Sequence, residues 1–377
     1  MTDMYHPNAK FPQHLLALSL NERRAYFRNG FVLNHESLAL AVDRVFSLID
    51  PSSEDSVIKV VGPTGAGKSV LCREVAKALV QRYESEGVLP PHPLVVHEIS
   101  SALHSNMDWK DFFIDLHEAI HAPDPKLLRG IAGVGYPRQG RVYTTRRMSA
   151  AELRTEFIKR LREYRIRVLI FDEAEYLFKY NAATADKMMN ALMSIASKAE
   201  CQIVLVGTYD GLSEMDYSGP LNRRVADVHF PNYAWGDSNE QRAFVSAYSG
   251  LLAHVPFELE GNLLDESCVQ WAYLASCGCI GILRDLIYSA VNKLPRDGVL
   301  TVSNLKQNQK NSRKLRQIAE EIAEGREYFE SGGELEALEG LLGVSGQSNV
   351  AKHQKPKSRT AQRRPGQRNP KRDPVGV

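Results

Sequence analysis

The segment Gly62-Pro-Thr-Gly-Ala-Gly67-Lys68-Ser69 has the residue types and spacing of a phosphate-binding loop. Its glycines allow successive backbone N–H groups to turn toward one anion, and the positive end of a following helix adds to the attraction. We expect Lys68 to reach the β- and γ-phosphates of a nucleotide and the Ser69 hydroxyl to coordinate Mg²⁺. The predicted contacts of this loop are Gly62, Pro63, Thr64, Gly65, Ala66, Gly67, Lys68, Ser69 and Val70.

Two carboxylates stand at the end of a second apolar run, Arg167-Val-Leu-Ile-Phe-Asp172-Glu173. Consecutive apolar residues predict a strand buried on both faces, and open α/β sheets bind ligands at the carboxyl ends of their strands. Asp172 would hold Mg²⁺ through water, and Glu173 would orient or deprotonate the attacking water. A simple turn is the alternative interpretation of these paired acids.

Thr208 and two arginines are candidates for contacts with a γ-phosphate. Thr208 follows the β-rich run 202–207, so its hydroxyl could sense the phosphate or polarise the attacking water, or could merely cap a turn. Arg223 and Arg224 precede the run 225–230 and suit a finger that reaches the γ-phosphate of a neighbouring subunit. Spacing does not decide which of the two is the finger, and a solvated basic turn is the alternative.

A glycine-led helical segment, Gly278-Cys-Ile-Gly281-Ile-Leu-Arg284, presents one more arginine. Arg284 could fold back on the nucleotide from a helical lid, which would add it to the nucleotide contacts. Alternatively, it could pair with Asp285 or Glu266 at the surface.

The segment Leu116-His-Glu-Ala-Ile-His-Ala-Pro123 contains H-E-x-x-H, the spacing with which two histidines bind zinc on one helix face. His117 and His121 would be the ligands, and Glu118 would activate a water. No third ligand follows in a recognisable pattern, and the histidines fall at the margin of an apolar helical stripe. That stripe consists of Trp109, Phe112, Phe113, Leu116 and Ile120. We therefore expect a packing helix rather than a metalloprotease site.

The spacing of apolar residues predicts the elements that position these side chains. Short β-rich runs cover residues 57–61, 93–99, 168–171, 202–207 and 225–230. A helix begins with the capping box Ser149-Ala-Ala-Glu152 and carries Leu153, Phe157 and Leu161 along one stripe. The expected fold class is α/β, a P-loop core with a parallel five-stranded sheet flanked by helices, plus a small helical lid and a disordered basic C-terminal tail. The expected divisions are an N-terminal extension (1–50), the core (51–231), the lid (232–325), a linker or short helix (326–350) and the tail (351–377).

Composition limits the class of protein. With 377 residues, 43% of them hydrophobic, the chain can bury a large core. No apolar run approaches the roughly 20 residues that span a bilayer, and MTDMYHPNAK lacks the layout of a secretion signal, so we expect a cytoplasmic protein without a membrane partner. The five scattered cysteines suggest neither a disulfide framework nor a zinc site.

Charge is distributed unevenly along the chain. Residues 351–377 hold nine Lys or Arg against one Asp, a net charge of +8, which leaves −6 for the other residues. This tail is poor in apolar residues and is expected to be disordered. It is either a solubilising end or an arm that binds phosphate backbones or a partner.

A second basic segment, residues 123–148, is longer than a nucleotide-binding core needs. Its glycines and arginines suit a loop that projects into the channel of an oligomer and contacts DNA phosphates without reading sequence. The candidate DNA contacts are Arg129, Arg138, Arg141, Arg146 and Arg147. A solvated loop is the alternative.

The P-loop, the DEAE block of residues 172–175, Gly207-Thr208, the arginine pair and the G-x-x-R helix together resemble an AAA+ ATPase. Over about Leu15 to Ala290 the chain more narrowly resembles the TniB/TnsC family of transposition regulators, through Asn34-His35, IFDEAEYL, IVLVGTYD and LNRRV. This resemblance implies an ATPase that uses ATP and Mg²⁺ and forms homo-oligomeric rings or filaments on double-stranded DNA. It would direct a transposase to a target chosen by an adaptor, either a DNA-binding protein or an RNA-guided complex.

The resemblance also implies roles by position. Lys68 and Ser69 match the Walker A pair, Asp172 and Glu173 match Walker B, Thr208 matches sensor 1, Arg223 or Arg224 matches the finger, and Arg284 matches sensor 2. Other classes stay open. The chain could be a helicase loader or another DNA-remodelling AAA+ protein, or a signalling switch in which nucleotide controls a protein partner. A P-loop kinase is disfavoured, because Glu173 and the candidate fingers suit attack by water.

Overall fold

The computed structural model describes residues 9–50, 52–100, 108–121, 148–179, 182–212 and 223–330, and the single positions 338 and 342. Residues 1–330 form one compact unit, and residues 331–377 form another. All helices and strands discussed below belong to the first unit.

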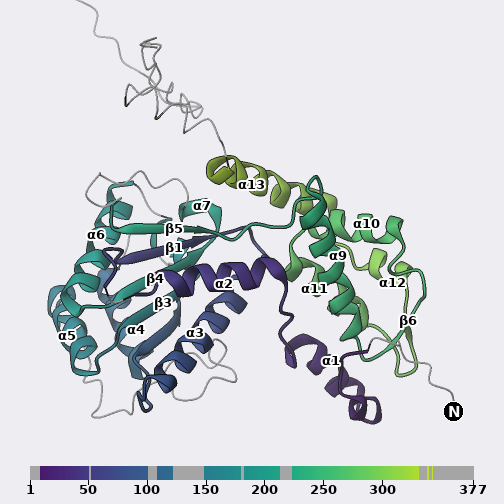
Figure 1. Cartoon of the computed structure of the whole chain (residues 1–377), viewed down its shortest axis with the longest axis horizontal. Coiled ribbons are helices and arrows are strands. Elements are labelled where there is room, and N and C mark those ends of the chain that lie inside the picture. The colour runs from purple at the N-terminus through teal and green to yellow at the C-terminus, as the bar shows by residue number, and fades with distance from the viewer. Residues whose placement is uncertain are drawn as a thin grey trace, which may run out of the picture. The chain divides into compact units, whose positions relative to one another are not determined.

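Five parallel strands form the central sheet, in the order β2-β3-β4-β1-β5 (Figure 1). They are β1 (Val57–Val61), β2 (Leu94–Glu98), β3 (Val168–Asp172), β4 (Gln202–Gly207) and β5 (Val225–His229). The strands β1, β3 and β4 are buried along their whole length, which explains their largely apolar sequences. Lys59, buried in the middle of β1, is paired with Asp227 of β5 at 3.1 Å. The α/β fold with a parallel five-stranded sheet, as expected from the sequence, is confirmed.

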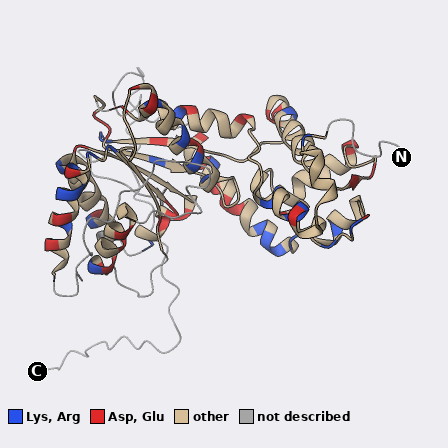
Figure 2. Cartoon of the chain, turned by 90° about the horizontal axis from the view of Figure 1, so that it is seen from below, with Lys and Arg blue, Asp and Glu red and all other residues tan. Residues whose placement is uncertain are grey.

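Helices cover both faces of this sheet. They are α2 (Glu36–Leu48), α3 (Lys68–Ser85), α4 (Trp109–His121), α5 (Ala150–Glu163) and α6 (Ala182–Ala199). Successive strand residues point to opposite faces, so β1 contributes Ile58 and Val60 to one core with α2 and α3, and Val57 and Val61 to another with α4, α5 and α6. In Figure 2 the strands are mostly tan, whereas the helices carry many red and blue positions, which mark Asp, Glu, Lys and Arg.

The predicted start of α5 is present in the structure. Ser149 and Glu152 form a capping box, in which each side chain satisfies a backbone N–H of the other residue. The expected stripe of Leu153, Phe157 and Leu161 is buried against the sheet. Local sequence chemistry therefore sets both the first residue of this helix and its buried face.

A helical lid follows the sheet in sequence. It contains α9 (Ser238–Ala253), β6 (Glu258–Leu259), α10 (Glu266–Ser276), α11 (Ile280–Val291), β7 (Val299–Leu300) and α12 (Val302–Gln307). A short 3₁₀ turn, η1 (Gln13–Ala17), and the helix α1 (Leu20–Asn29) precede the sheet, yet Phe27 of α1 is fully buried in the core of the lid. The lid therefore includes a segment from before β1.

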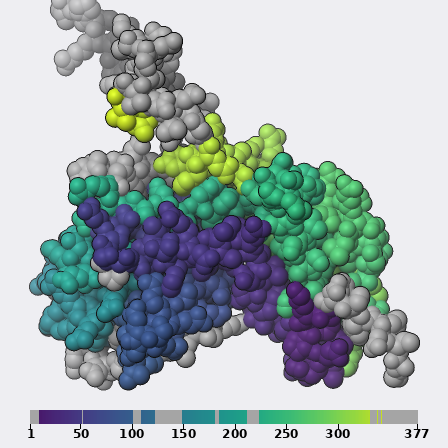
Figure 3. Space-filling model, in the orientation of Figure 1, coloured from purple at the N-terminus to yellow at the C-terminus, as the bar shows by residue number. Residues whose placement is uncertain are grey.

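Three further elements lie close to the carboxyl edge of the sheet. They are η3 (Ala174–Leu177), α7 (Tyr209–Leu212) and the long helix α13 (Ser312–Glu330). Figure 3 shows α13, in yellow-green, lying over residues of both the sheet domain and the lid. The division that the sequence suggested after residue 325 falls within α13.

In the part of the chain that the structure describes, no single helix is long and apolar enough to cross a membrane, although α10 and α11, bent by 108°, meet the length and composition criteria as a pair.

Candidate nucleotide site

The glycine loop connects the end of β1 to the start of α3, as the sequence predicts. Gly65 and Gly67 have φ angles of +81° and +109°, which residues with a Cβ rarely adopt. Gly62 lies so close to Phe230 that an added Cβ would stand 2.2 Å from its carbonyl oxygen. Glycine is therefore required at these positions both for the turn of the chain and for the close packing of β1 on the segment after β5.

A pocket of about 320 Å³ opens in front of this loop. Its walls come from the P-loop, from Glu173, from the end of α1 and from α11. The lining residues are Arg28, Asn29, Gly65, Gly67, Lys68, Ser69, Val70, Glu173, Gly281, Arg284, Asp285 and Tyr288. Five of the nine predicted loop contacts share this cavity with Arg284, whereas Gly62, Pro63, Thr64 and Ala66 are not among its lining residues. The contribution of α1 was not predicted, because nothing in its sequence distinguishes it from an ordinary surface helix.

Lys68 is buried in the first turn of α3. Its Nζ donates hydrogen bonds to the carbonyl oxygens of Gly62, at 3.1 Å, and Pro63, at 2.9 Å. Burial lowers the pKa of this ammonium, and the charges of Glu175, Asp172 and other nearby carboxylates oppose that shift. The cation is therefore held on its own loop, surrounded by acids, at the position expected for contact with phosphates.

Asp172 ends β3 and is almost completely buried. Its Oδ1 accepts a hydrogen bond from the Glu173 N–H, whereas Oδ2 is buried and forms no hydrogen bond of ordinary geometry with the described residues. Burial raises the pKa of this carboxyl, and the nearby Ser69 hydroxyl favours the charged form. A buried carboxylate oxygen without a partner, beside a hydroxyl at the start of a helix, is a suitable donor set for a hard divalent cation.

Glu173 has a φ of +54°, an uncommon conformation for a residue with a side chain. It is half-buried and lines the pocket. Burial, together with the like charges of Glu175 and Asp172, raises the pKa of Glu173 to about 7. Such a carboxyl can exchange a proton near neutral pH, as a general base must.

Glu175 joins this group, although no role of its own was predicted for it. It is buried, and its Oε1 accepts a hydrogen bond from the Thr208 hydroxyl at 3.0 Å. Thr208 therefore lies beside the carboxylates, as expected from its place after β4, with its hydroxyl directed toward Glu175. The 3₁₀ turn η3 explains this arrangement, because it brings the second Glu of the DEAE block back over the end of β4.

Arg284 lines the pocket, but its guanidinium binds backbone carbonyl oxygens at the end of α1. Its guanidinium donates hydrogen bonds to the carbonyl oxygens of Phe27, Arg28 and Phe31, each at 3.0 Å, and lies over the Phe31 ring. It therefore closes the carboxyl end of α1, where helix carbonyls lack partners. Neither surface pairing that the sequence suggested, with Asp285 or Glu266, is among its hydrogen bonds.

The two arginines before β5 have different surroundings. Arg224 donates to the Ser56 hydroxyl at 2.7 and 3.2 Å, which holds it within its own subunit. The Arg223 side chain is 79% exposed and lies 3.8 Å from the equally exposed Glu54. Both precede the residue of β5 that pairs with the first residue of β1, so they lie at the opposite end of the strands from the P-loop.

The two histidines of the H-E-x-x-H segment are buried in α4, not at the margin of its apolar stripe as expected. His117 Nε2 lies 3.0 Å from the Leu153 carbonyl oxygen, and His121 Nε2 accepts from Arg160 at 2.8 Å. The histidines are buried because α5 packs against this side of α4 and covers it, which agrees with the expected packing helix. Both histidines serve the contact between the two helices.

The proposed DNA contacts Arg129, Arg138, Arg141, Arg146 and Arg147, and the basic tail, lie outside the described residues.

Residues 50–215 match the family model of an AAA domain. No curated protein sequence matches the chain.

Several solved structures are similar in outline. The Walker-type ATPase PABY2304 of Pyrococcus abyssi is 16% identical, with 82% of this chain and 76% of that chain covered and a TM-score of 0.47. The ORC2 protein of Aeropyrum pernix, in ADPNP–ADP complexes, is 12% identical, with 79% and 71% covered and a TM-score of 0.43. Drosophila ORC bound to DNA is 16% identical, with 81% and 70% covered and a TM-score of 0.39. From the match over residues 50–215, the chain contains an AAA domain, and this domain is a P-loop ATPase.

Proposed function

We propose that this protein is an ATP-dependent regulator of DNA transposition, which assembles on double-stranded DNA and directs a transposase to its target. The position of Arg223 is the observation that supports assembly of several protomers. The P-loop and the carboxylates lie at the carboxyl edge of the sheet, whereas Arg223 precedes β5 at the amino edge. A strand of five residues spans roughly 16 Å, so Arg223 cannot complete its own site and would act on that of a neighbour.

Within one protomer, each residue of the proposed nucleotide site has a separate role. Lys68 would turn from the loop carbonyls to the β- and γ-phosphates of ATP, and Ser69 and Asp172 would hold Mg²⁺, directly and through water. The Mg²⁺ ion supplies charge neutralisation at the phosphates when bound. Glu173 would orient the attacking water and take its proton, and Thr208 would hold Glu175 beside it.

The proposed finger is Arg223 rather than Arg224. Arg224 is tied to Ser56, whereas Arg223 is exposed and its contact with Glu54 is long and solvated. An exposed guanidinium can move to a neighbouring γ-phosphate at little cost. ATP would therefore bridge protomers, and hydrolysis would release them.

The DNA and transposition parts rest on sequence. The basic segments 123–148 and 351–377 suit contacts with phosphate backbones, with Arg138, Arg141, Arg146 and Arg147 as candidates. The resemblance to the TniB/TnsC family suggests the transposase and the target-selection adaptor. A DNA-remodelling ATPase, such as a helicase loader, shares the DNA-dependent assembly but would act on other partners.

The test is assembly of the full-length protein on random-sequence duplex DNA with a non-hydrolysable ATP analogue, followed by electron microscopy and a parallel phosphate-release assay. We expect regular rings or filaments that Lys68→Ala abolishes. Lys77→Ala, which removes a partly exposed lysine from the same helix, is the matched control and should assemble normally.

The outcomes separate the rival functions. Assembly that requires both DNA and Lys68, followed by stimulation of a transposase, supports the proposal. Assembly without an effect on any transposase favours a DNA-remodelling ATPase. Nucleotide binding without DNA-dependent assembly at low salt would point to a switch that acts on a protein partner.

A further inference from the structure

The long helix α13 packs along the seam between the sheet domain and the lid. Its apolar residues Leu315, Ile318, Ile322 and Phe329 recur at helical spacing, and Ile318 and Ile322 pack against Ile282 of α11. At its other end, the Phe329 ring stacks on His229 of β5, with ring centroids 4.5 Å apart. One helix therefore contacts both parts of the molecule that enclose the nucleotide pocket.

Gly325 sets how closely α13 approaches the sheet domain. It lies directly on the ring of Tyr209 in α7, so that an added Cβ would stand 2.4 to 2.5 Å from three ring atoms. Any larger residue would force the helix away from the sheet domain. The close approach is therefore built into the sequence of α13.

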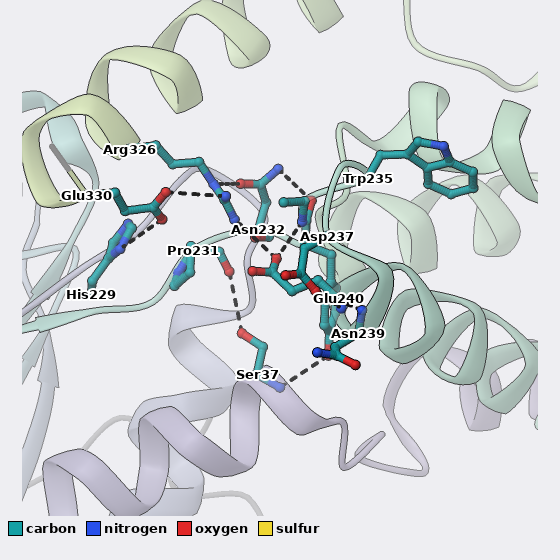
Figure 4. A network of polar contacts seen from close by, with 12 residues as sticks. Ser37, His229, Pro231, Asn232, Trp235, Asp237, Asn239, Glu240, Arg326 and Glu330 are labelled. Atoms are coloured by element: carbon teal, nitrogen blue, oxygen red, sulfur yellow. Dashed lines mark hydrogen bonds and ion pairs between the residues drawn. The ribbon is translucent and has the colours of Figure 1, made fainter. Parts of the chain in front are cut away.

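Arg326 fastens α13 to the segment that links β5 to α9 (Figure 4). Its Nε donates to Asn232 Oδ1 at 3.0 Å, and its Nη2 lies 3.4 Å from Glu240 Oε2. Glu240 in turn accepts from the Ala234 N–H at 2.6 Å. On the side of the sheet, Glu330 lies between Arg326, at 3.5 Å, and His229, at 3.7 Å. This network joins α13 to the β5–α9 segment, along which the chain passes from the sheet domain to the lid.

Docking of α13 brings Glu321 to the P-loop. Its carboxylate faces the Thr64 backbone N–H and lies within the electrostatic reach of Lys68, and its Oε1 is buried without a hydrogen-bond partner among the described residues. Burial raises the pKa of this carboxyl, while Lys68 and the Thr64 N–H favour its charged form. An anion of this chain thus lies at a backbone N–H of the phosphate-binding loop and near Lys68, whose Nζ donates to the Gly62 and Pro63 carbonyl oxygens.

We propose that α13 is an autoinhibitory clasp, in which the Glu321 carboxylate takes up the Thr64 N–H and places a negative charge near Lys68, so that the γ-phosphate of ATP and docked α13 compete. The inference rests on the proposed nucleotide site. ADP lacks the γ-phosphate and is compatible with docked α13. ATP places like charges side by side, which favours release of α13 and, through Arg326, frees the β5–α9 segment.

The charge is tested separately from the docking contact. Glu321→Gln keeps the shape of the side chain and removes its charge, and Glu324→Gln makes the same change at an exposed position of α13. We expect Glu321→Gln to bind a non-hydrolysable ATP analogue about tenfold more tightly than the wild type, with ADP affinity nearly unchanged. The control should match the wild type for both nucleotides. Calorimetric titration of the full-length proteins gives both affinities.

Docking is tested by Gly325→Ala, which disturbs the Tyr209 contact without touching the P-loop. We expect the same gain in ATP-analogue affinity as in Glu321→Gln. We also expect amide hydrogen exchange within residues 312–330 to be faster with the analogue than with ADP in the wild type.

The measurements distinguish failure of the clasp from failure of the nucleotide site. The clasp would be overturned if Glu321→Gln and Glu324→Gln bound the ATP analogue equally tightly, or if α13 exchanged amide hydrogens equally fast with both nucleotides. In either case, binding that depends on Lys68 would still support the nucleotide site. Equal binding of the analogue by wild type and Lys68→Ala would overturn the site and the clasp together.

Discussion

At the scale of single residues, three acids close together in sequence lie in three environments. Asp172 is buried beside Ser69, Glu173 lines the pocket from a left-handed backbone conformation, and Glu175 is buried under Thr208. Desolvation and like charges raise the pKa of Glu173 to about 7, so this carboxyl can take a proton near neutral pH. Its surroundings, rather than its residue type, make Glu173 the candidate base.

We therefore expect Glu173→Gln to bind ATP normally but to hydrolyse it at least about 100-fold more slowly, because an amide cannot accept the proton of the attacking water. Steady-state phosphate release and equilibrium nucleotide binding measure the two effects. Glu118→Gln, at an exposed position of the H-E-x-x-H segment, should leave both unchanged. Full turnover by Glu173→Gln would exclude Glu173 as the base, and lost turnover in Glu118→Gln would reopen the role of α4.

At the scale of elements, the P-loop and α11 meet through two glycines. The Gly281 N–H donates to the Gly65 carbonyl oxygen at 2.8 Å, and a Cβ on Gly281 would stand 2.5 Å from that oxygen. On the other side, a Cβ on Gly65 would stand 2.4 Å from Ile282 Cγ1. The lid therefore supports the conformation of the phosphate-binding loop by direct backbone contact.

Gly281→Ala should push α11 off the loop, at a cost of about 1–3 kcal/mol in unfolding free energy, and should weaken nucleotide binding. Chemical denaturation and nucleotide titration test the two effects. Gly261→Ala is the matched control, because no atom lies within 4 Å of its added Cβ. If Gly281→Ala binds nucleotide as the wild type does, the lid contact does not support the loop.

At the scale of the whole molecule, we propose that the finger and the base of one active site belong to different protomers. Arg223→Ala should bind ATP but lose most of its turnover, by roughly 1,000-fold, because the charge at the γ-phosphate is no longer stabilised from the neighbour. Arg224→Ala should lose less, since Arg224 contacts Ser56 of its own chain.

Mixing two inactive variants tests this division directly. In an assembly of Arg223→Ala with Glu173→Gln subunits, some sites combine an intact Glu173 with an intact Arg223 from the neighbour. We expect phosphate release well above that of either variant alone. No recovery in mixed assemblies that form normally would mean that the finger does not act between protomers.

The amino-acid sequence is sufficient to predict the sheet, the phosphate loop and the residues at strand ends. Apolar runs bounded by turns specify buried parallel strands, and the carboxyl ends of such strands must meet at one edge. Lys68, Asp172, Glu173 and Thr208 are therefore brought together by strand order and chain direction alone. The need for glycine in the loop is equally local, because positive φ angles exclude most residues that carry a Cβ.

The partners of these side chains depend instead on tertiary packing. Arg284 closes α1 and Arg224 contacts Ser56, because segments distant in sequence supply carbonyls and a hydroxyl that no local pattern predicts. The histidines of α4 are buried because α5 covers them. The apolar spacing of α13 is present in the sequence, but an amphipathic stripe does not specify which surface it covers. That Glu321 faces the P-loop follows from the packing of Gly325 on Tyr209, a contact between residues far apart in the chain.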